Sequence, residues 1–394
     1  MNKQYMMNTY GRFDVIFEKG LGAKLYDVNG KEYVDFVAGV AVNCLGHSHP
    51  AIIHALSKQS NMLMHVSNLY WNAPQLELAE MLVTHSKLDQ VFFCNSGTEA
   101  VESALKLARK YGKSKEEGKH ELLYMENSFH GRTMGALAVT GQEKYQKSFM
   151  PLMEGVKTVK FNDIEDLTQK MSDQVCGVII EPIQGEGGIL PASKEFLEAI
   201  RKLCDQYDAL MIYDEVQCGM GRTGKLFAYE VYDILPDIVC MAKGLGGGFP
   251  IGAIMAGKKA ADAFEPGDHG CTFGGNPLAC AVSLAVLHEL IHGGVVEKVA
   301  EKSQYMIEKI NALQKEYKSI QGIQGMGLML GIRLDGDTKQ FVAKCFEKGL
   351  LVVGAGAHVV RLVPPLNVMK DEIDAALFIM KEVLEEMKAE VKNS

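Results

Sequence analysis

The stretch Ile238-Val239-Cys240-Met241-Ala242-Lys243-Gly244-Leu245-Gly246-Gly247-Gly248 joins an apolar run to a lysine and a glycine-rich loop. A second apolar run upstream, Ala209-Leu210-Met211-Ile212-Tyr213, ends in Asp214-Glu215. Both runs have the length and composition of buried strands. Ligands of open α/β sheets bind beyond the carboxyl ends of the strands. We therefore expect a buried amine and a buried carboxylate at one edge of a single sheet.

The surrounding sequence predicts an α/β fold. Short apolar runs alternate with amphipathic stretches between about residues 91 and 256, and runs this apolar indicate a mainly parallel sheet covered on both faces. From about residue 285 the pattern changes to long helices with short strands between them, which predicts a small α+β domain. The predicted strands are 24–27, 32–36, 91–94, 121–125, 175–180, 209–213, 238–242, 327–332 and 350–353, and the predicted helices are 98–111, 194–207, 280–290, 296–317 and 373–387.

Three segments are expected from this pattern. Residues 1–48 form an N-terminal segment that joins the small domain, residues 49–284 a large domain, and residues 285–394 the C-terminal small domain. A chain of 394 residues is long enough for two such domains. We find no internal repeat and no low-complexity tract along it.

Bulk composition excludes several classes of function. The formal net charge is -8 and Lys and Arg form no large cluster, so neither nucleic acid nor an anionic membrane is an expected partner. No apolar run is long enough to span a bilayer and no signal core follows the first residues, so a cytoplasmic location is expected. Nine scattered cysteines without a CxxC pair predict neither a disulfide framework nor a zinc site, and His47-Ser48-His49-Pro50 is interpreted as a turn rather than a metal site.

The pair formed by Asp214 and Lys243 suits one cofactor, pyridoxal phosphate. This cofactor bonds covalently to a lysine amine and needs an acid near its ring nitrogen. A carboxylate there favours the protonated nitrogen, because an opposite charge within a few ångströms stabilises the charged form. Two other interpretations of the pair are an ordinary salt bridge and two solvated strand ends. The neighbouring segments favour the cofactor.

Other segments at the same predicted edge could bind anions and aromatic rings. Ser96 with Glu99 is a capping-box pattern, and the helix it begins could hold a phosphate at Gly97 and Thr98. Segment 127–133 offers a ring for stacking and an arginine for a substrate carboxylate, although core packing and a surface charge are the simpler explanations of the two side chains.

One arginine lies in an apolar strand near the C-terminus. Arg361 within Val359-Val360-Arg361-Leu362-Val363 needs a carboxylate partner if it is buried, and Glu186 is a candidate. A fixed interdomain salt bridge would explain the same pair.

Taken together, these segments resemble the class III aminotransferases of pyridoxal phosphate fold type I, over nearly the whole chain. The resemblance implies an aspartate-aminotransferase-like fold, with a sheet of the seven-stranded type in the large domain, and an obligate homodimer with composite sites. It rests on eight blocks in order: Gly46-His47-Ser48-His49-Pro50, Ser96-Gly97-Thr98-Glu99-Ala100, Ser128-Phe129-His130-Gly131-Arg132-Thr133, Glu181-Pro182-Ile183-Gln184-Gly185-Glu186, Asp214-Glu215-Val216-Gln217, Ala242-Lys243-Gly244, Thr272-Phe273-Gly274-Gly275-Asn276-Pro277 and Arg361-Leu362-Val363-Pro364-Pro365.

The resemblance also implies a role for each matching residue. Lys243 would bind the cofactor covalently and then move a proton. The implied cofactor-binding residues are Asp214 at the ring nitrogen, Gln217 at the ring hydroxyl, Phe129 and Val216 on the two ring faces, and Gly97, Thr98 and the partner's Thr272 at the phosphate. The implied substrate-binding residues are Arg132, Glu186, Arg361 and Cys271, the last of which stands where close relatives have a hydroxyl residue.

The implied substrates are N-acetylornithine and 2-oxoglutarate, and the products are N-acetylglutamate 5-semialdehyde and glutamate, as in arginine biosynthesis. Arg132 would bind the α-carboxylate of N-acetylornithine, and Glu186 would mask Arg361 until the second carboxylate of 2-oxoglutarate arrives. Ornithine, succinylornithine, N-acyl-diaminopimelate and 4-aminobutyrate stay open as amine donors. An aminomutase or decarboxylase of this class would share the fold and the cofactor, but the presence of Glu186 with Arg361 disfavours both. A noncatalytic relative is disfavoured because Lys243 and Asp214 are retained.

Overall fold

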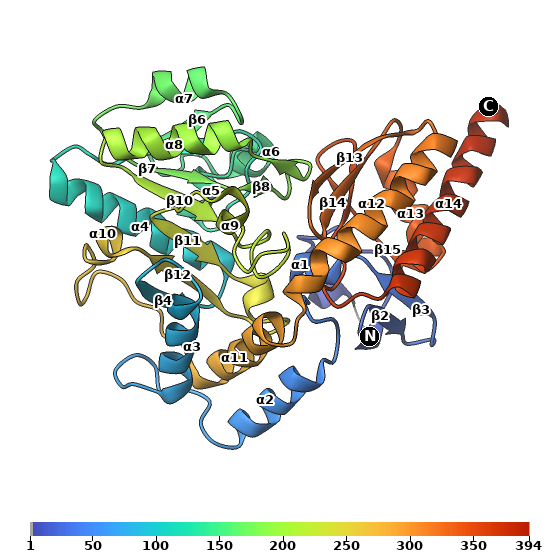
Figure 1. Ribbon diagram of the computed structural model, residues 1–394, viewed down its shortest axis with the longest axis horizontal. Helices are drawn as coiled ribbons and strands as arrows, with labels where there is room; N and C mark the ends of the chain where they lie inside the picture. The colour runs from blue at the N-terminus through green and yellow to red at the C-terminus, as the bar shows by residue number, and fades with distance from the viewer. Residues whose placement is uncertain (1–2, 394) are drawn as a thin grey trace.

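A mixed seven-stranded sheet lies at the centre of the large domain in the computed structural model, which describes residues 3–393 (Figure 1). All its strands are parallel except β12, which lies antiparallel between β4 and β11. The mainly parallel sheet expected from the sequence is confirmed. Its strands, in spatial order, are β4 (Gln90–Cys94), β12 (Gly252–Ala256), β11 (Ile238–Met241), β10 (Leu210–Asp214), β7 (Val175–Ile180), β5 (Glu121–Met125) and β6 (Val156–Val159).

Side chains that alternate along each strand pack into a different layer on each face of this sheet. In β5, Leu122 and Tyr124 pack in the cluster that includes helix α4 (Gly97–Lys115), while Leu123 packs in the cluster that includes α8 (Lys194–Gln206). Successive strand residues point to opposite faces, so a strand covered on both sides must be apolar throughout. That requirement explains the unbroken apolar runs in the sequence.

The C-terminal domain is an antiparallel sheet covered by helices. Its strands follow the order β13 (Ile320–Met326), β14 (Met329–Leu334), β17 (Val359–Leu362) and β16 (Val353–Ala355). The strand expected at 327–332 is displaced by two residues, because Gly327 and Leu328 form the turn between β13 and β14 and Gly327 has a φ of 57° that suits glycine. The helices of this domain are α12 (Val299–Glu316), α13 (Thr338–Glu347) and α14 (Lys370–Asn393).

The N-terminal segment joins the C-terminal domain through a shared sheet. Strands β1 (Phe17–Leu21), β2 (Lys24–Asp27) and β3 (Glu32–Asp35) are antiparallel neighbours, and β3 pairs in parallel with β15 (Leu350–Leu351). We therefore propose the division into segments 1–48, 49–284 and 285–394, although helix α11 (Pro277–Ile291) continues across residue 284.

The remaining elements are short or lie at the edges of these layers. Pro50–Ser60 (α2) and Ala73–Thr84 (α3) pack on α11, and β8 (Ile183–Gln184) pairs with β9 (Leu190–Pro191) in a hairpin. No single described helix is long and apolar enough to cross a bilayer; α11 and the following Val296–Glu316 meet that criterion only together, with a bend of 47° between them. The others are α1 (Ala38–Ala41), α5 (Met134–Ala138), α6 (Glu143–Gln146), α7 (Ile164–Lys170), α9 (Tyr229–Tyr232), α10 (Lys258–Ala261) and the 3-10 turns Lys3–Tyr5, Lys147–Phe149, Lys243–Leu245 and Val296–Lys298.

Candidate functional site

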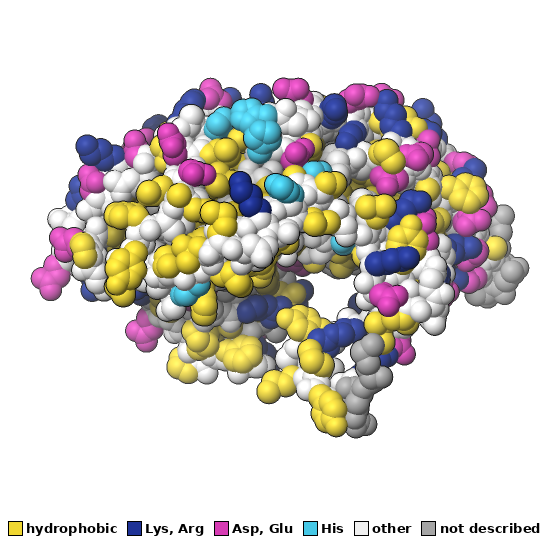
Figure 2. All heavy atoms as spheres, turned by 90° about the horizontal axis from the view of Figure 1, so that it is seen from below, with side chains coloured by type: hydrophobic (Ala, Val, Ile, Leu, Met, Phe, Trp, Pro, Cys, Tyr) yellow, Lys and Arg dark blue, Asp and Glu magenta, His cyan; other side chains and the backbone are white. Residues whose placement is uncertain are grey.

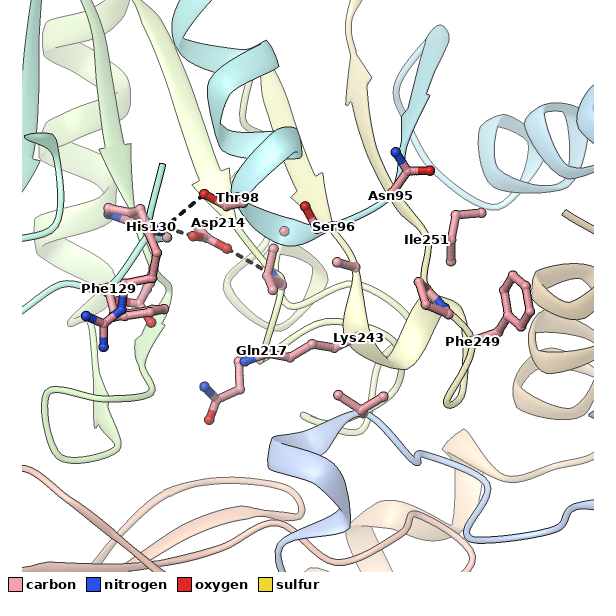
Figure 3. A pocket seen from close by; sticks show the side chains of 18 of the residues that line it. Asn95, Ser96, Thr98, Phe129, His130, Asp214, Gln217, Lys243, Phe249 and Ile251 are labelled. Atoms are coloured by element: carbon pink, nitrogen blue, oxygen red, sulfur yellow. Dashed lines mark hydrogen bonds and ion pairs between the residues drawn. The ribbon is translucent and has the colours of Figure 1, made fainter. Parts of the chain in front are cut away.

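A cavity of about 410 Å³ lies at the carboxyl ends of the central strands (Figure 3). Asp214, the last residue of β10, and Lys243, two residues after β11, both line it. The two side chains that the sequence places at one edge of the sheet therefore share one cavity. Most of the residues predicted to bind the cofactor line it as well: Gly97, Thr98, Phe129, Val216 and Gln217.

Asp214 is held in place by two hydrogen bonds. Its Oδ2 atom lies 2.7 Å from Nδ1 of His130, and its Oδ1 atom accepts the Val216 N–H at 3.0 Å. The carboxylate is 4% exposed, and Nε2 of the buried His130 has no hydrogen-bond partner among the described residues. A fixed carboxylate at the cavity wall suits the protonated nitrogen of a heteroaromatic ring.

Lys243 has the chemistry expected of a group that exchanges a proton. Burial lowers the pKa of its amine, and the positive charge of Arg361 lowers it further, whereas Glu186, Asp214 and Glu181 oppose the shift. A lowered pKa increases the fraction of neutral amine, which is the form that attacks a carbonyl carbon or accepts a proton. Its φ of 45° is unusual for a residue with a side chain and is of the kind that clusters at functional sites.

The amino end of helix α4 borders the same cavity. Ser96 is the N-cap residue and its hydroxyl accepts the Glu99 N–H at 3.3 Å, which confirms the predicted cap. Gly97 and Thr98 are the first two residues of the helix, so their N–H groups have no helical acceptor and can bind an anion. A Cβ at position 97 would lie 2.8 Å from Cγ1 of Val216, so only glycine fits there without displacing that side chain.

These features fit pyridoxal phosphate. The cavity brings together a buried lysine, a carboxylate fixed by two hydrogen bonds, and unpaired N–H groups at a helix end, which match the aldehyde, the ring nitrogen and the phosphate of this cofactor. No group of three or more metal-ligating side chains occurs among the residues that the structure describes.

Arg132 lies at the border of the cavity against two aromatic rings. Its guanidinium carbon is 3.9 Å from the centre of the Tyr145 ring and 5.4 Å from that of Phe129. Within the described part of the chain Arg132 has no carboxylate within ion-pair distance, so its charge is available to a ligand. Tyr145 was not predicted from the sequence, because no motif there marks it.

Arg361 is paired with Glu186, as the sequence predicted. Its Nη1 atom lies 2.5 Å from Oε1 of Glu186, 3.0 Å from Oε1 of Gln217 and 3.3 Å from the Gly185 carbonyl oxygen. Arg361 is 2% exposed, whereas the Glu186 side chain is 26% exposed. Gln217 lines the cavity, so the guanidinium lies directly behind the cavity wall.

Thr272 and Cys271 do not line the cavity of their own chain. Thr272 is exposed, and its carbonyl oxygen accepts a hydrogen bond from Ser67 at 3.2 Å. Sγ of Cys271 accepts a hydrogen bond from Nδ2 of Asn95, which does line the cavity, at 3.0 Å. Cys271 therefore acts on the cavity of its own chain through Asn95.

Sequence reasoning missed a second buried carboxylate in the site. Glu181 accepts the N–H groups of Phe129 and Gly185 at 2.9 Å each and joins the two segments that carry the predicted side chains. Burial raises the pKa of Glu181 to about 7; the neighbouring His130 opposes this shift and the charge of Asp214 adds to it. Its position at the end of β7 was the available signal.

Comparisons with known proteins agree with this geometry. The family Aminotransferase class-III matches residues 5–384. The acetylornithine aminotransferase of Clostridium acetobutylicum is 59% identical over 97% of this chain and 99% of its own length, and that of Methanocaldococcus jannaschii is 48% identical over 98% of each. Among solved structures, the ornithine aminotransferase of Toxoplasma gondii superposes with a TM-score of 0.93 at 32% identity, covering 98% of this chain and 94% of that one. The N-acetylornithine aminotransferase of Stenotrophomonas maltophilia gives 0.85 at 38% identity, with 96% and 98% covered.

Proposed function

Because the chain belongs to the class III aminotransferases, we propose that it transfers the δ-amino group of N-acetylornithine to 2-oxoglutarate. The products are N-acetylglutamate 5-semialdehyde and glutamate, so the reaction serves arginine biosynthesis. N-acetylornithine is the substrate named for the relatives that share about half or more of their residues with this chain over nearly its full length.

The chain is a transaminase that uses pyridoxal phosphate. Bound to Lys243, this cofactor supplies a carbon that accepts amines and a ring that withdraws electrons from the substrate. In our proposal Nζ of Lys243 accepts the proton from the substrate carbon and later returns it, which its lowered pKa favours. Asp214 holds the proton on the ring nitrogen. The N–H groups of Gly97 and Thr98 would bind the phosphate, Gln217 would bond the ring hydroxyl, and Phe129 and Val216 would contact the ring.

The observation that carries the use of two unlike substrates is the buried pair between Arg361 and Glu186, whereas the choice of N-acetylornithine as donor rests on the relatives. A monoamine donor with one carboxylate needs one arginine, which Arg132 supplies. The second substrate, 2-oxoglutarate, has two carboxylates and needs a second arginine, which Arg361 supplies once Glu186 moves aside. Glu186 is partly exposed and its neighbours Gly185 and Gly187 permit backbone movement, so Glu186 can move away from Arg361.

We also propose that the enzyme is a homodimer in which Thr272 binds the phosphate of the partner's cofactor. The Thr272 carbonyl accepts a hydrogen bond from Ser67, whose segment 62–71 carries exposed apolar side chains. Figure 2 shows hydrophobic side chains on the underside of the molecule. Large exposed apolar patches on a soluble protein mark interaction sites. The surface is formed by Met62, Met64, Leu69, Tyr70, Trp71 and Phe273, which are between 55% and 84% exposed.

A cytoplasmic location is part of the proposal. All nine cysteines are described and none is in a disulfide. Free cysteines are the rule in a compartment that keeps thiols reduced.

A half-reaction titration tests the substrate. The purified holoenzyme is mixed with N-acetylornithine, ornithine or 4-aminobutyrate in parallel, and the absorbance of the cofactor bound to Lys243 is followed. We expect fast loss of this absorbance with N-acetylornithine and its recovery with 2-oxoglutarate. Faster loss with another amine would assign the enzyme to that donor, and a colourless protein would contradict the transaminase mechanism.

A further inference from the structure

Turn α1 has a backbone conformation that its sequence does not favour. The φ angles of Ala38, Gly39, Val40 and Ala41 are 48°, 64°, 65° and 64°. This left-handed region brings Cβ too close to the following carbonyl oxygen, so among these four residues only glycine adopts it freely. Residues with a Cβ remain in such a conformation only where the surrounding structure imposes it.

Asp35 and His47 hold the start of this turn, and backbone hydrogen bonds from Val40 and Ala41 to the Val37 carbonyl continue it. Oδ1 of Asp35 accepts the N–H groups of Val37 and Ala38, each at 2.9 Å, and so fixes the start of the turn. Its Oδ2 atom lies 2.8 Å from Nε2 of His47. The His47 backbone is bonded in both directions to Gly22, at 3.0 and 2.8 Å. The pair therefore closes segment 35–47 at its base, and Asp35 is 2% exposed.

An apolar cluster links the turn to the two elements that carry Glu186 and Arg361. Ala41 lies in an apolar cluster with Ile183 and Ile189 of the hairpin around Glu186, and with Val359 and Val363 on either side of Arg361. This cluster is the packing contact through which a shift of the turn would reach both charged side chains.

The residues that flank the turn are bonded to both lobes. The Phe36 carbonyl accepts the Val363 N–H at 2.9 Å, and the Cys44 carbonyl accepts the Leu366 N–H at 2.7 Å. On the other side, Sγ of Cys44 donates to the carbonyl of Gly244, the residue after Lys243, at 3.2 Å. In Figure 3 the blue turn lies below Lys243. The segment thus connects the strand of Arg361 with the loop of Lys243.

We propose that Asp35 and His47 are positioning residues that hold turn α1 and thereby set the place of Arg361 relative to Lys243. They touch neither cofactor nor substrate. Their effect falls on the second carboxylate of a dicarboxylate ligand, because Arg361 is the group that the turn supports. This inference deepens the proposed function and rests on its assignment of Arg361.

Glutarate, which has two carboxylates and cannot be transaminated, is the probe. Its dissociation constant is measured by calorimetry on the holoenzyme and on Asp35→Asn and His47→Gln. Small misplacements of a binding group cost large factors, so we expect both substitutions to weaken glutarate binding at least about tenfold. The rate of the half-reaction of Asp35→Asn with N-acetylornithine should stay within about twofold of the parent, because the single carboxylate of this donor binds Arg132, whose backbone is bonded to Thr98 of α4 and not to α1.

Asp27→Asn is the matched control. Asp27 is also a buried aspartate of the N-terminal sheet whose Oδ1 accepts two N–H groups, those of Asn29 and Lys31 at 2.8 and 2.9 Å. Asp27 does not contact α1, so the glutarate affinity of Asp27→Asn should match that of the parent enzyme. Val40→Gly added to Asp35→Asn should restore much of the affinity, because glycine adopts the left-handed conformation without the support of Asp35.

Three results would overturn the inference: unchanged glutarate affinity in Asp35→Asn, equal weakening in Asp27→Asn, or further weakening when Val40→Gly is added. Absence of glutarate binding to the parent enzyme would overturn it too. Failure of N-acetylornithine as a donor, with glutarate binding as expected, would instead refute only the proposed substrate.

Discussion

Glu186→Gln should increase the preference of the enzyme for amine donors with two carboxylates, such as glutamate. The substitution removes the negative charge that competes with substrate for Arg361 but keeps a hydrogen-bond acceptor of the same shape. A hydrogen bond to a charged group contributes about 1.5–3 kcal/mol. The Glu186 side chain is 26% exposed and glutamine keeps a neutral hydrogen bond, so the interaction energy lost with Arg361 lies near the lower limit of this range. About 1.4 kcal/mol corresponds to a roughly tenfold faster half-reaction with glutamate.

The assay compares second-order rate constants for loss of cofactor absorbance with glutamate and with N-acetylornithine in stopped flow. We expect the ratio of the two constants to change about tenfold in favour of glutamate. Gln324→Met is the control, because Nε2 of Gln324 donates to the Gly188 carbonyl and steadies the same loop without a charge. An unchanged ratio, or the same change in Gln324→Met, would refute the masking of Arg361 by Glu186.

Four further substitutions test other parts of the protein. Lys243→Ala should reduce turnover at least about a thousandfold in a coupled assay while cofactor content stays measurable, and substantial turnover would contradict its role. Arg132→Met should slow both half-reactions about tenfold or more in stopped flow; an effect on one alone would exclude a shared carboxylate site. Burial raises the pKa of Glu215 to about 8, so the folded protein keeps a proton that the unfolded chain releases near pH 4.5. The contribution of this group to the free energy of unfolding is full below pH 4.5 and is lost as the pH rises to 8. In urea denaturation, the free energy of unfolding of Glu215→Gln should therefore increase by a few kcal/mol relative to the parent between pH 5 and pH 8. The same pH dependence of this free energy in both proteins would contradict the prediction. Trp71→Ala should raise the dissociation constant of the proposed homodimer at least about tenfold in sedimentation, and an unchanged constant would exclude this surface as the interface.

Within the central sheet, the sequence predicted the strands that form distinct apolar runs and missed the two whose runs are half polar or begin close to a loop. Strands β10 and β11 are continuous apolar runs and were placed correctly with Asp214 and Lys243 at their ends. Strand β6, Val156-Lys157-Thr158-Val159, lies at the edge of the sheet and is half polar, so its pattern is weak. Strand β12, Gly252-Ala253-Ile254-Met255-Ala256, is apolar and buried, but it begins close behind the glycine-rich loop, so the sequence does not mark its start.

Some of the charged contacts of the site could be predicted from the sequence and others could not. The pairing of Arg361 with Glu186 could be predicted, because a buried guanidinium needs an acid. The link between His130 and Asp214 and the left-handed turn α1 could not, since neither residue type nor spacing marks them and tertiary contacts alone impose them.

The pairing of β3 with β15 has a consequence for biosynthesis on the ribosome. Val34 lies beside Leu350, so the first sheet of the chain gains its last strand only after almost the whole polypeptide has emerged. The strands of the central sheet all lie between residues 90 and 256 and can associate earlier. Domains generally form as units during synthesis. The N-terminal strands must therefore wait, with their edge unpaired, while the middle of the chain folds, and a pause or truncation before residue 350 would expose that edge to other nascent chains.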